Sequence, residues 1–241
     1  MIKKLLIFVF LLSGYASNAQ VIISLLLGDV LNTGKIEFGL DGGLNLSTIS
    51  GVEHGNYSKD LNLGFYFDIK MKNPSWLFHT GVIVKSSMGI DNLPVYSLHN
   101  DTLDNAFKGG SVDRKFNYFN VPFMMKYKIS KRIYVEGGPM LALRTKCFDT
   151  FTNKVKESDD LTYKLDISDN YHRIDAGIIA GAGYRLFGGN GMNLGVRYYM
   201  GLMDILVDNP GPAQYNRSIY VVVGIPIGAG KAKKKQEAKA N

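Results

Sequence analysis

The chain has 241 residues, 46% of them hydrophobic, and a formal net charge of +7. Two positive charges lie at Lys3 and Lys4 and a net four in residues 231–241, which leaves about +1 for the body of the chain. The basic charge therefore lies at the two ends of the chain, and it does not indicate a nucleic-acid-binding face. The single cysteine, Cys147, excludes an intrachain disulfide.

The first segment has the order of a secretory signal. It begins with the basic Lys3 and Lys4, continues with the apolar residues 5–12, and ends in small residues up to Ala19. The apolar run is shorter than the roughly 20 residues that a membrane-spanning helix needs. These features predict a signal peptide at residues 1–19 that is cleaved after Ala19, so that the mature chain lies beyond the inner membrane.

Residues 20–34 are apolar without a clear period and are assigned only as a lead-in segment. Beyond them, apolar and polar residues alternate with the period of two that is typical of half-buried strands. In residues 61–71, for example, Leu63 and Phe65 alternate with Tyr66 and Asp68. Eight such strands are predicted, at about 35–46, 61–71, 76–86, 114–128, 132–145, 171–187, 192–200 and 217–227.

The connections between these strands alternate in length. Short turns are expected at 72–75, 129–131 and 188–191, and long loops at 47–60, 87–113, 146–170 and 202–216. This alternation is typical of an up-and-down barrel with one loop end and one turn end, and outer-membrane barrels have that asymmetry. The predicted fold is therefore all-β: an eight-stranded antiparallel transmembrane β-barrel at residues 35–228, with both termini periplasmic and a basic periplasmic tail at 229–241.

The inward face of such a barrel is expected to be polar and filled, because eight strands leave little room inside. Charges of both signs fall on that face and can pair into a network, which predicts a closed interior and no ion channel. The charged members of this predicted network are Asp68, Lys70, Lys85, Lys126, Glu136, Asp175 and Arg197.

Several stretches resemble the PorT-like outer-membrane β-barrel family. They are FGLDGGLNLSTISG, YFNVPFMMKYKI with YVEGGPML, DAGIIAGAGYRL, LGVRYYMGLMDI and NRSIYVVVGIPIG, and together they cover nearly all of the mature chain. The resemblance implies an integral outer-membrane barrel, some of whose relatives are linked to protein secretion across the envelope. The family usually carries a carboxylate two residues before the proline of the fourth strand. Asn120 occupies that place here and joins the predicted interior polar network.

No catalytic, cofactor-binding or metal-binding residues are predicted. The four histidines, His54, His79, His99 and His172, lack the close spacing of a zinc site and are interpreted as solvated residues in or near loops. The acidic residues of 146–170 lack the twelve-residue pattern of a calcium loop.

The preferred function is a non-enzymatic barrel that presents loops 87–113 and 146–170 to envelope or secretion proteins, with outer-membrane lipid around it and no nucleic acid. Two alternatives stay open. An outer-membrane enzyme would bring His99 or His172 close to Asp101, Asp166 or Asp169 in a loop-borne site. A soluble periplasmic ligand-binding barrel would have inverted faces, with Leu63, Phe65 and Phe67 pointing inward.

Overall fold

The computed structural model describes residues 35–156, 159–187, 191–207 and 211–227. The predicted signal peptide, the lead-in segment and the basic tail all lie outside these residues. The elements are β1 (Ile36–Ser50), β2 (Asn56–Lys70), β3 (Trp76–Leu93), α3 (Asp101–Phe107), β4 (Ser111–Lys128), β5 (Ile133–Lys156), β6 (Asp159–Asp166), a 3-10 turn η2 (Ser168–Asn170), β7 (Ile174–Arg185), β8 (Asn193–Gly201) and β9 (Tyr215–Pro226).

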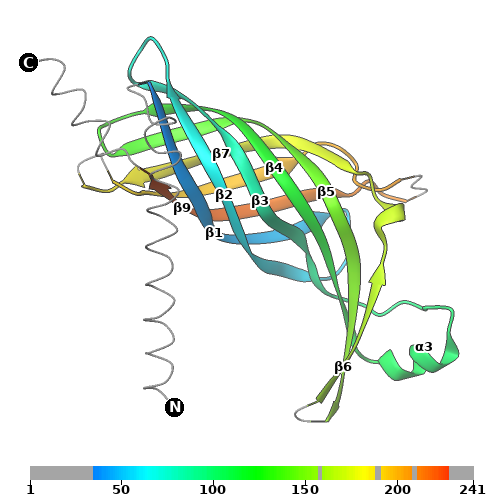
Figure 1. The fold of residues 1–241 in the computed structure, drawn as a ribbon. Coiled ribbons are helices and arrows are strands. Elements are labelled where there is room, and N and C mark those ends of the chain that lie inside the picture. Colours follow the sequence, from blue (N-terminus) through cyan, green and yellow to red (C-terminus); the bar gives the residue numbers. More distant parts are fainter. Residues whose placement is uncertain (1–34, 157–158, 188–190, 208–210, 228–241) are drawn as a thin grey trace, which may run out of the picture.

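Eight of the strands form a closed ring (Figure 1). Their order is β4-β3-β2-β1-β9-β8-β7-β5, and pairing between β4 and β5 closes the ring. The first and last strands of the described chain pair antiparallel from Gly39 with Pro226 to Ser50 with Tyr215. The predicted all-β, eight-stranded antiparallel barrel is confirmed. The remaining strand, β6, pairs with the outer part of β5 and does not belong to the ring.

The two faces of each ring strand differ as the alternation predicts. Leu63 on β2 is 53% exposed, whereas Tyr66 on the opposite face is 2% exposed. Phe65 and Phe67 share the outward face with Leu63 and form a ring pair whose centroids are 6.1 Å apart. The inverted faces required by the soluble-barrel alternative are therefore contradicted, because the apolar residues of β2 point out of the ring.

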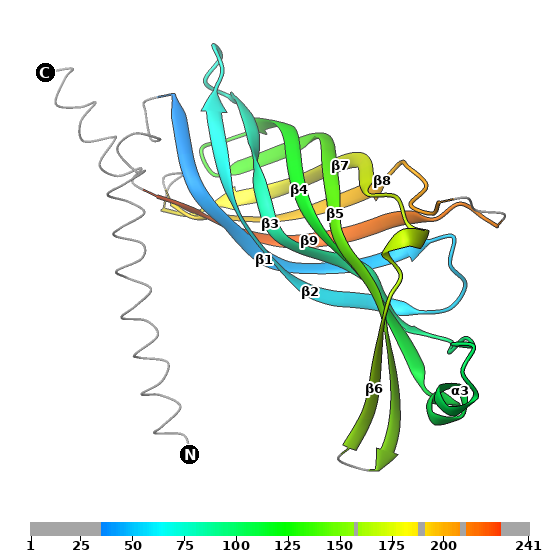
Figure 2. The same ribbon diagram turned by 45° about the vertical axis from the view of Figure 1, so that its right-hand side comes forward.

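Strands β4 and β5 continue beyond the ring and build an outer lobe at the long-loop end (Figures 1 and 2). We use this name for α3, residues 111–117 of β4, residues 146–156 of β5, β6 and η2. β4 and β5 stay paired out to Ser111 and Thr152, and β6 adds itself to β5 from Phe148 with Asp166 onward.

Three predicted loops are corrected by these extensions. The predicted loop 47–60 shrinks because β1 runs to Ser50 and β2 starts at Asn56, while 87–113 contains the end of β3, the helix α3 and the start of β4. The predicted loop 146–170 is largely the β5–β6 hairpin. The physical reason is that polar side chains such as Ser47 and Asp149 are fully buried here, so polarity does not mark a loop.

The helix α3 is short, and contacts at both of its ends fix its position. The side chain of Asn100 caps it by accepting hydrogen bonds from the backbone N–H groups of Thr102 and Leu103, at 3.1 and 3.2 Å. At the other end Phe107 is 1% exposed and its ring lies 5.8 Å from that of Phe151 on β5. The helix is thus attached to the outer lobe by an aromatic contact.

Candidate functional site

Five charged side chains and one histidine, from six ring strands, meet inside the barrel. We call this the central charge cluster, and its members are Asp41 on β1, Asp68 on β2, His79 on β3, Lys126 on β4, Glu136 on β5 and Arg197 on β8. Each of them is no more than 5% exposed. Because these strands are distant in the sequence, the cluster ties opposite sides of the ring together.

Two cations hold the three carboxylates. Lys126 Nζ lies 2.9 Å from Asp68 Oδ2 and 3.4 Å from Glu136 Oε2. Arg197 donates from Nε to Glu136 Oε1 at 2.5 Å and from Nη1 to Asp41 Oδ2 at 2.7 Å. Charge-assisted hydrogen bonds of this kind are the strong ones in a protein interior, and breaking one leaves a buried charge without its partner.

His79 bridges the two halves of the cluster. Its Nδ1 lies 2.6 Å from Asp68 Oδ1 and its Nε2 lies 3.2 Å from Arg197 Nη2. A guanidinium can only donate, so the contact with Arg197 fits the tautomer in which Nε2 accepts and Nδ1–H donates to Asp68. The ring also stacks on Tyr66 at a centroid distance of 5.5 Å. The interpretation of His79 as a solvated residue is therefore wrong, because its place on β3 puts it on the inward face.

The structure separates the members of the predicted interior network. It brings Asp68, Lys126, Glu136 and Arg197 together. Lys85, in contrast, is exposed. The pairing of β3 with β4 shifts register between Ile83 and Ser86. The extra residue of this bulge turns Lys85 to the outward face.

Lys70, also expected inside, is an exposed residue at the end of β2. Asp175 and Asn120 are buried but belong to a second, mostly neutral layer. Asn120 donates to Ser86 Oγ at 2.9 Å and Asn216 donates to Asp175 Oδ2 at 2.8 Å. The expected inward set is thus divided into a charged cluster, a layer rich in amides and hydroxyls, and two exposed lysines.

Glycines on β7 make room for the large inward side chains. A Cβ atom on Gly183 would collide with the phenol of Tyr134, and one on Gly181 would come within 2.9 Å of the Arg197 side chain. Lys126 Nζ lies over the Tyr134 ring at 4.6 Å from its centroid. The glycines of this strand therefore allow bulky residues of the facing strands to fill the narrow ring.

Two cluster members were missed by the sequence reasoning. Asp41 lies in a strand in which glycines interrupt the alternation of apolar and polar residues. His79 lies three residues after the start of β3. The signal that could have found both was the alternation itself. His79 shares its face with Gly81 and Ile83, and Asp41 shares its face with Asn45.

The outer lobe has its own buried ion pair. The Arg114 guanidinium donates from Nε to Asp149 Oδ1 at 2.8 Å and from Nη2 to Asp149 Oδ2 at 2.6 Å, which is a bidentate arrangement. Tyr96 donates to Asp149 Oδ2 at 2.9 Å, and Arg114 Nη1 donates to Tyr171 Oη at 2.6 Å. Burial, and then the neighbouring Asp149 carboxylate, raise the pKa of the Tyr96 phenol. These contacts fasten the 94–100 segment and η2 to the β4–β5 extension.

The loop-borne site of the enzyme alternative is not assembled in the described part of the chain. No hydrogen bond or ion pair there joins the imidazole of His99 or His172 to Asp101, Asp166 or Asp169. Asp166 instead accepts from the backbone N–H of Ser168 at 2.9 Å. Within the described ranges, no three His, Cys, Asp or Glu side chains are grouped so that they could hold a metal ion.

The closed ring, with apolar residues outward and paired charges inward, has the architecture of an outer-membrane β-barrel. Residues 17–207 match the family model described as outer membrane protein beta-barrel domain, and the chain belongs to this family. The sequence has no significant match among curated proteins. In the described ranges no helix is both long and apolar enough to cross a membrane.

Solved structures with a similar fold include three bacterial surface barrels. Ail, the attachment invasion locus protein of Yersinia pestis, is 11% identical with a TM-score of 0.43, and the match covers 80% of this chain and 99% of that one. Neisserial surface protein A is 10% identical with a TM-score of 0.42, covering 78% and 96%. OprG from Pseudomonas aeruginosa is 12% identical with a TM-score of 0.33, covering 82% and 97%.

Proposed function

We propose that this protein is a non-enzymatic outer-membrane barrel that holds the outer lobe in place to contact a protein of the envelope or of the cell exterior. The observation that carries this proposal is the outer lobe itself. It is a folded surface built from α3, β6 and the extensions of β4 and β5, and its own core includes Phe107, Phe116 and Phe151, each no more than 1% exposed. Folded elements that project from a rigid scaffold are well suited to recognition.

The filled ring supports this role over a conduit. The central charge cluster crosses the interior, and Tyr66, Tyr199 and Tyr220, each no more than 2% exposed, occupy further inward positions. A pore needs a continuous water-filled lumen, and large paired side chains work against one.

The absence of an assembled His-carboxylate pair among the described loop residues favours binding over catalysis as the role of the long-loop end. The resemblance to the PorT-like family favours secretion across the envelope as the process in which the protein takes part. In this proposal the short turns and both termini face the periplasm, the outer lobe faces outward, and the apolar belt that includes Leu63 and Val196 contacts lipid.

The test places a photo-crosslinking amino acid in intact cells at Leu161, an exposed residue of β6 that is 40% accessible. We expect a discrete cross-linked protein that mass spectrometry identifies. A matched variant carries the same group at Leu202, which is 55% exposed at the same end of the ring but outside the outer lobe. This control should yield no such product or a much weaker one.

Three outcomes would contradict the proposal. One is equal cross-linking from both positions. Another is a steady ion conductance of the purified protein in a planar bilayer. The third is a hydrolytic turnover that disappears in the His99→Ala or His172→Ala variant.

A further inference from the structure

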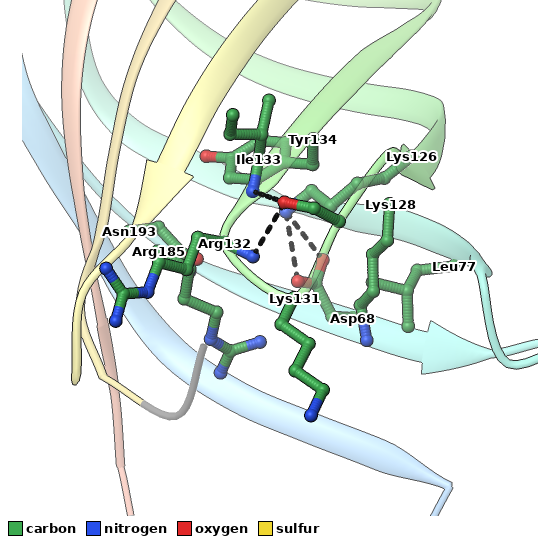
Figure 3. A pocket seen from close by; sticks show the side chains of 11 residues that line it. Asp68, Leu77, Lys126, Lys128, Lys131, Arg132, Ile133, Tyr134, Arg185 and Asn193 are labelled. Carbon is green, nitrogen blue, oxygen red and sulfur yellow. Dashed lines mark hydrogen bonds and ion pairs between the residues drawn. The ribbon is translucent and has the colours of Figure 1, made fainter. Parts of the chain in front are cut away.

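A small pocket opens at the turn end of the ring, opposite the outer lobe. It lies beneath the turn between β4 and β5, and Arg185 at the end of β7 and Asn193 at the start of β8 form its other wall (Figure 3). Its floor is the buried pair of Lys126 and Asp68. We call it the turn-end pocket. It is separate from every surface that the proposed function uses.

The lining of this pocket is strongly cationic. Five basic side chains line it, and Asp68 supplies the only carboxylate among the lining residues; the cations are Lys126, Lys128, Lys131, Arg132 and Arg185. Asp68 is already engaged by Lys126 at 2.9 Å and by His79 at 2.6 Å. Its charge is therefore not available to the other cations.

The carboxylates that contact the lining cations from outside the pocket, those of Glu136 and Glu37, are also engaged. Glu136 accepts from Arg197 at 2.5 Å. Glu37 on β1 pairs with Arg185 through Oε2 and accepts from Tyr66 Oη at 3.2 Å through Oε1. Arg132 donates to a neutral partner, Tyr184 Oη, at 3.0 Å. None of the salt bridges found in the described residues includes Lys128, Lys131 or Arg132. Among the described residues, three cations at one pocket thus have no anionic partner.

Cations that line one pocket repel one another, and an anion that binds between them relieves that repulsion. A carboxylate presents two oxygens in a plane, which a single arginine satisfies. A phosphate group spreads its charge over several oxygens in a tetrahedron and can accept from an arginine fork and from two ammonium groups together. We propose that the open mouth of the turn-end pocket binds a phosphate group, with the exposed Lys131 and Arg132 and the half-buried Lys128 as its main donors.

The phosphate could come from a lipid headgroup or from a free phosphate in solution. Trp76 and Tyr127 pair across β3 and β4 next to Lys128, with ring centroids 4.8 Å apart and both side chains 39% exposed on the outward face. Exposed aromatic rings of this kind mark the level of lipid headgroups in membrane proteins. The phosphate of a lipid headgroup can therefore reach the pocket. The experiment distinguishes it from free phosphate.

The experiment uses the full chain folded in a maltoside detergent and titrates inorganic phosphate by calorimetry in phosphate-free buffer. We expect saturable binding that weakens at least tenfold in the variant Lys128→Gln/Lys131→Gln/Arg132→Gln. The control removes three exposed lysines from the other end of the protein, as Lys108→Gln/Lys146→Gln/Lys154→Gln, and should bind within twofold of the unaltered chain. Heat-dependent gel mobility verifies that both variants are folded.

The source is resolved by repeating the titration in nanodiscs. If phosphatidylglycerol in the disc abolishes binding of inorganic phosphate while uncharged maltoside does not, the pocket takes a lipid headgroup. If the binding persists in the disc, the pocket takes free phosphate. An equal loss in the pocket variant and the control, or no saturable binding by the unaltered chain, would overturn the proposal.

Discussion

Arg197 is a single residue on which much of the ring interior depends. It contacts Glu136 at 2.5 Å and Asp41 at 2.7 Å, and its side chain is 4% exposed. A buried ion pair gives little net stability compared with apolar residues of the same size, because desolvation offsets the attraction. Removing one partner alone is costly, since the remaining charge stays buried without compensation.

We therefore expect Arg197→Met to lower the free energy of unfolding by about 3–5 kcal/mol, because Asp41 loses its cation and Glu136 keeps only the Lys126 ammonium at 3.4 Å. Urea unfolding of the protein in lipid vesicles measures this change. The matched control is Lys115→Met, which breaks the partly exposed pair with Asp60 at 3.2 Å. It should cost no more than about 1 kcal/mol. Similar losses in the two variants would contradict a central role for the cluster.

Asp104 in α3 gives a pH-dependent signal at the scale of one residue. Its carboxylate accepts from Ser97 Oγ at 2.6 Å and from the backbone N–H of Leu98 at 2.7 Å. These bonds favour the charged form and lower the pKa of Asp104 from its ordinary value of 3.8. The stabilisation is therefore fully present above the ordinary value and is lost as the pH falls through the lowered pKa.

The NMR shift of the Leu98 amide should report this titration. We expect a midpoint below 3.8, and we expect the titration to be absent in Asp104→Asn, whose amide does not ionise in this range. A midpoint at or above the ordinary value would show that the two hydrogen bonds do not favour the carboxylate.

At the scale of elements, the ring and the outer lobe are held by different interactions. The ring strands are paired on both edges, whereas β6 pairs with β5 alone. The lobe depends on an aromatic core in which the Phe151 ring lies 5.0 Å from Tyr96, 5.8 Å from Phe107 and 6.3 Å from Tyr163. A defect in this core should therefore loosen the lobe and leave the ring closed.

Phe151→Ala tests this separation. Phe151 is fully buried, and truncation of such a residue costs about 3–5 kcal/mol through lost burial and the cavity left behind. We expect trypsin to cut the variant within the lobe while the ring fragment keeps its heat-dependent gel mobility. Leu161→Ala, at a position that is 40% exposed, should be as resistant as the unaltered chain. Collapse of the ring in Phe151→Ala would show that the two parts fold as one unit.

For the whole molecule, the outward apolar belt determines where the protein is stable. Leu63 and Val196, both 53% exposed, lie on strands at different places around the ring. Exposed apolar residues spread over a closed sheet are costly in water and favourable in lipid. A folded, monodisperse protein without detergent would therefore be incompatible with the membrane interpretation.

Phe65→Arg measures the lipid contact directly. An arginine near the bilayer midplane of a barrel costs about 2–4 kcal/mol, and the cost falls toward the interfaces. Phe65→Ala is the control, because it removes the ring contacts with Phe67 at 6.1 Å and Phe38 at 6.2 Å without adding a charge. Unfolding in lipid vesicles should show the arginine variant as the less stable of the two. Equal stabilities would mean that position 65 does not face lipid.

The sequence by itself determined the ring. Alternation with a period of two marks the strands, and it places Asp68, Lys126, Glu136 and Arg197 on one face, because side chains of a strand point to opposite sides in turn. Alternating short and long connections then indicate antiparallel neighbours. These signals are local, which is why they can be read without knowing what each strand packs against.

Only the tertiary structure decided the outer lobe and the composition of the central charge cluster. From the sequence alone, Asp149 is interpreted as part of a polar loop. In the structure Arg114, which is 35 residues away in sequence, neutralises its charge inside the β4–β5 extension. Lys85 leaves the interior because a register shift between two paired strands reverses its face, and neither strand alone encodes that shift. Burial of a charge and the position of a bulge both depend on a distant partner, and so they are settled when the sheet closes.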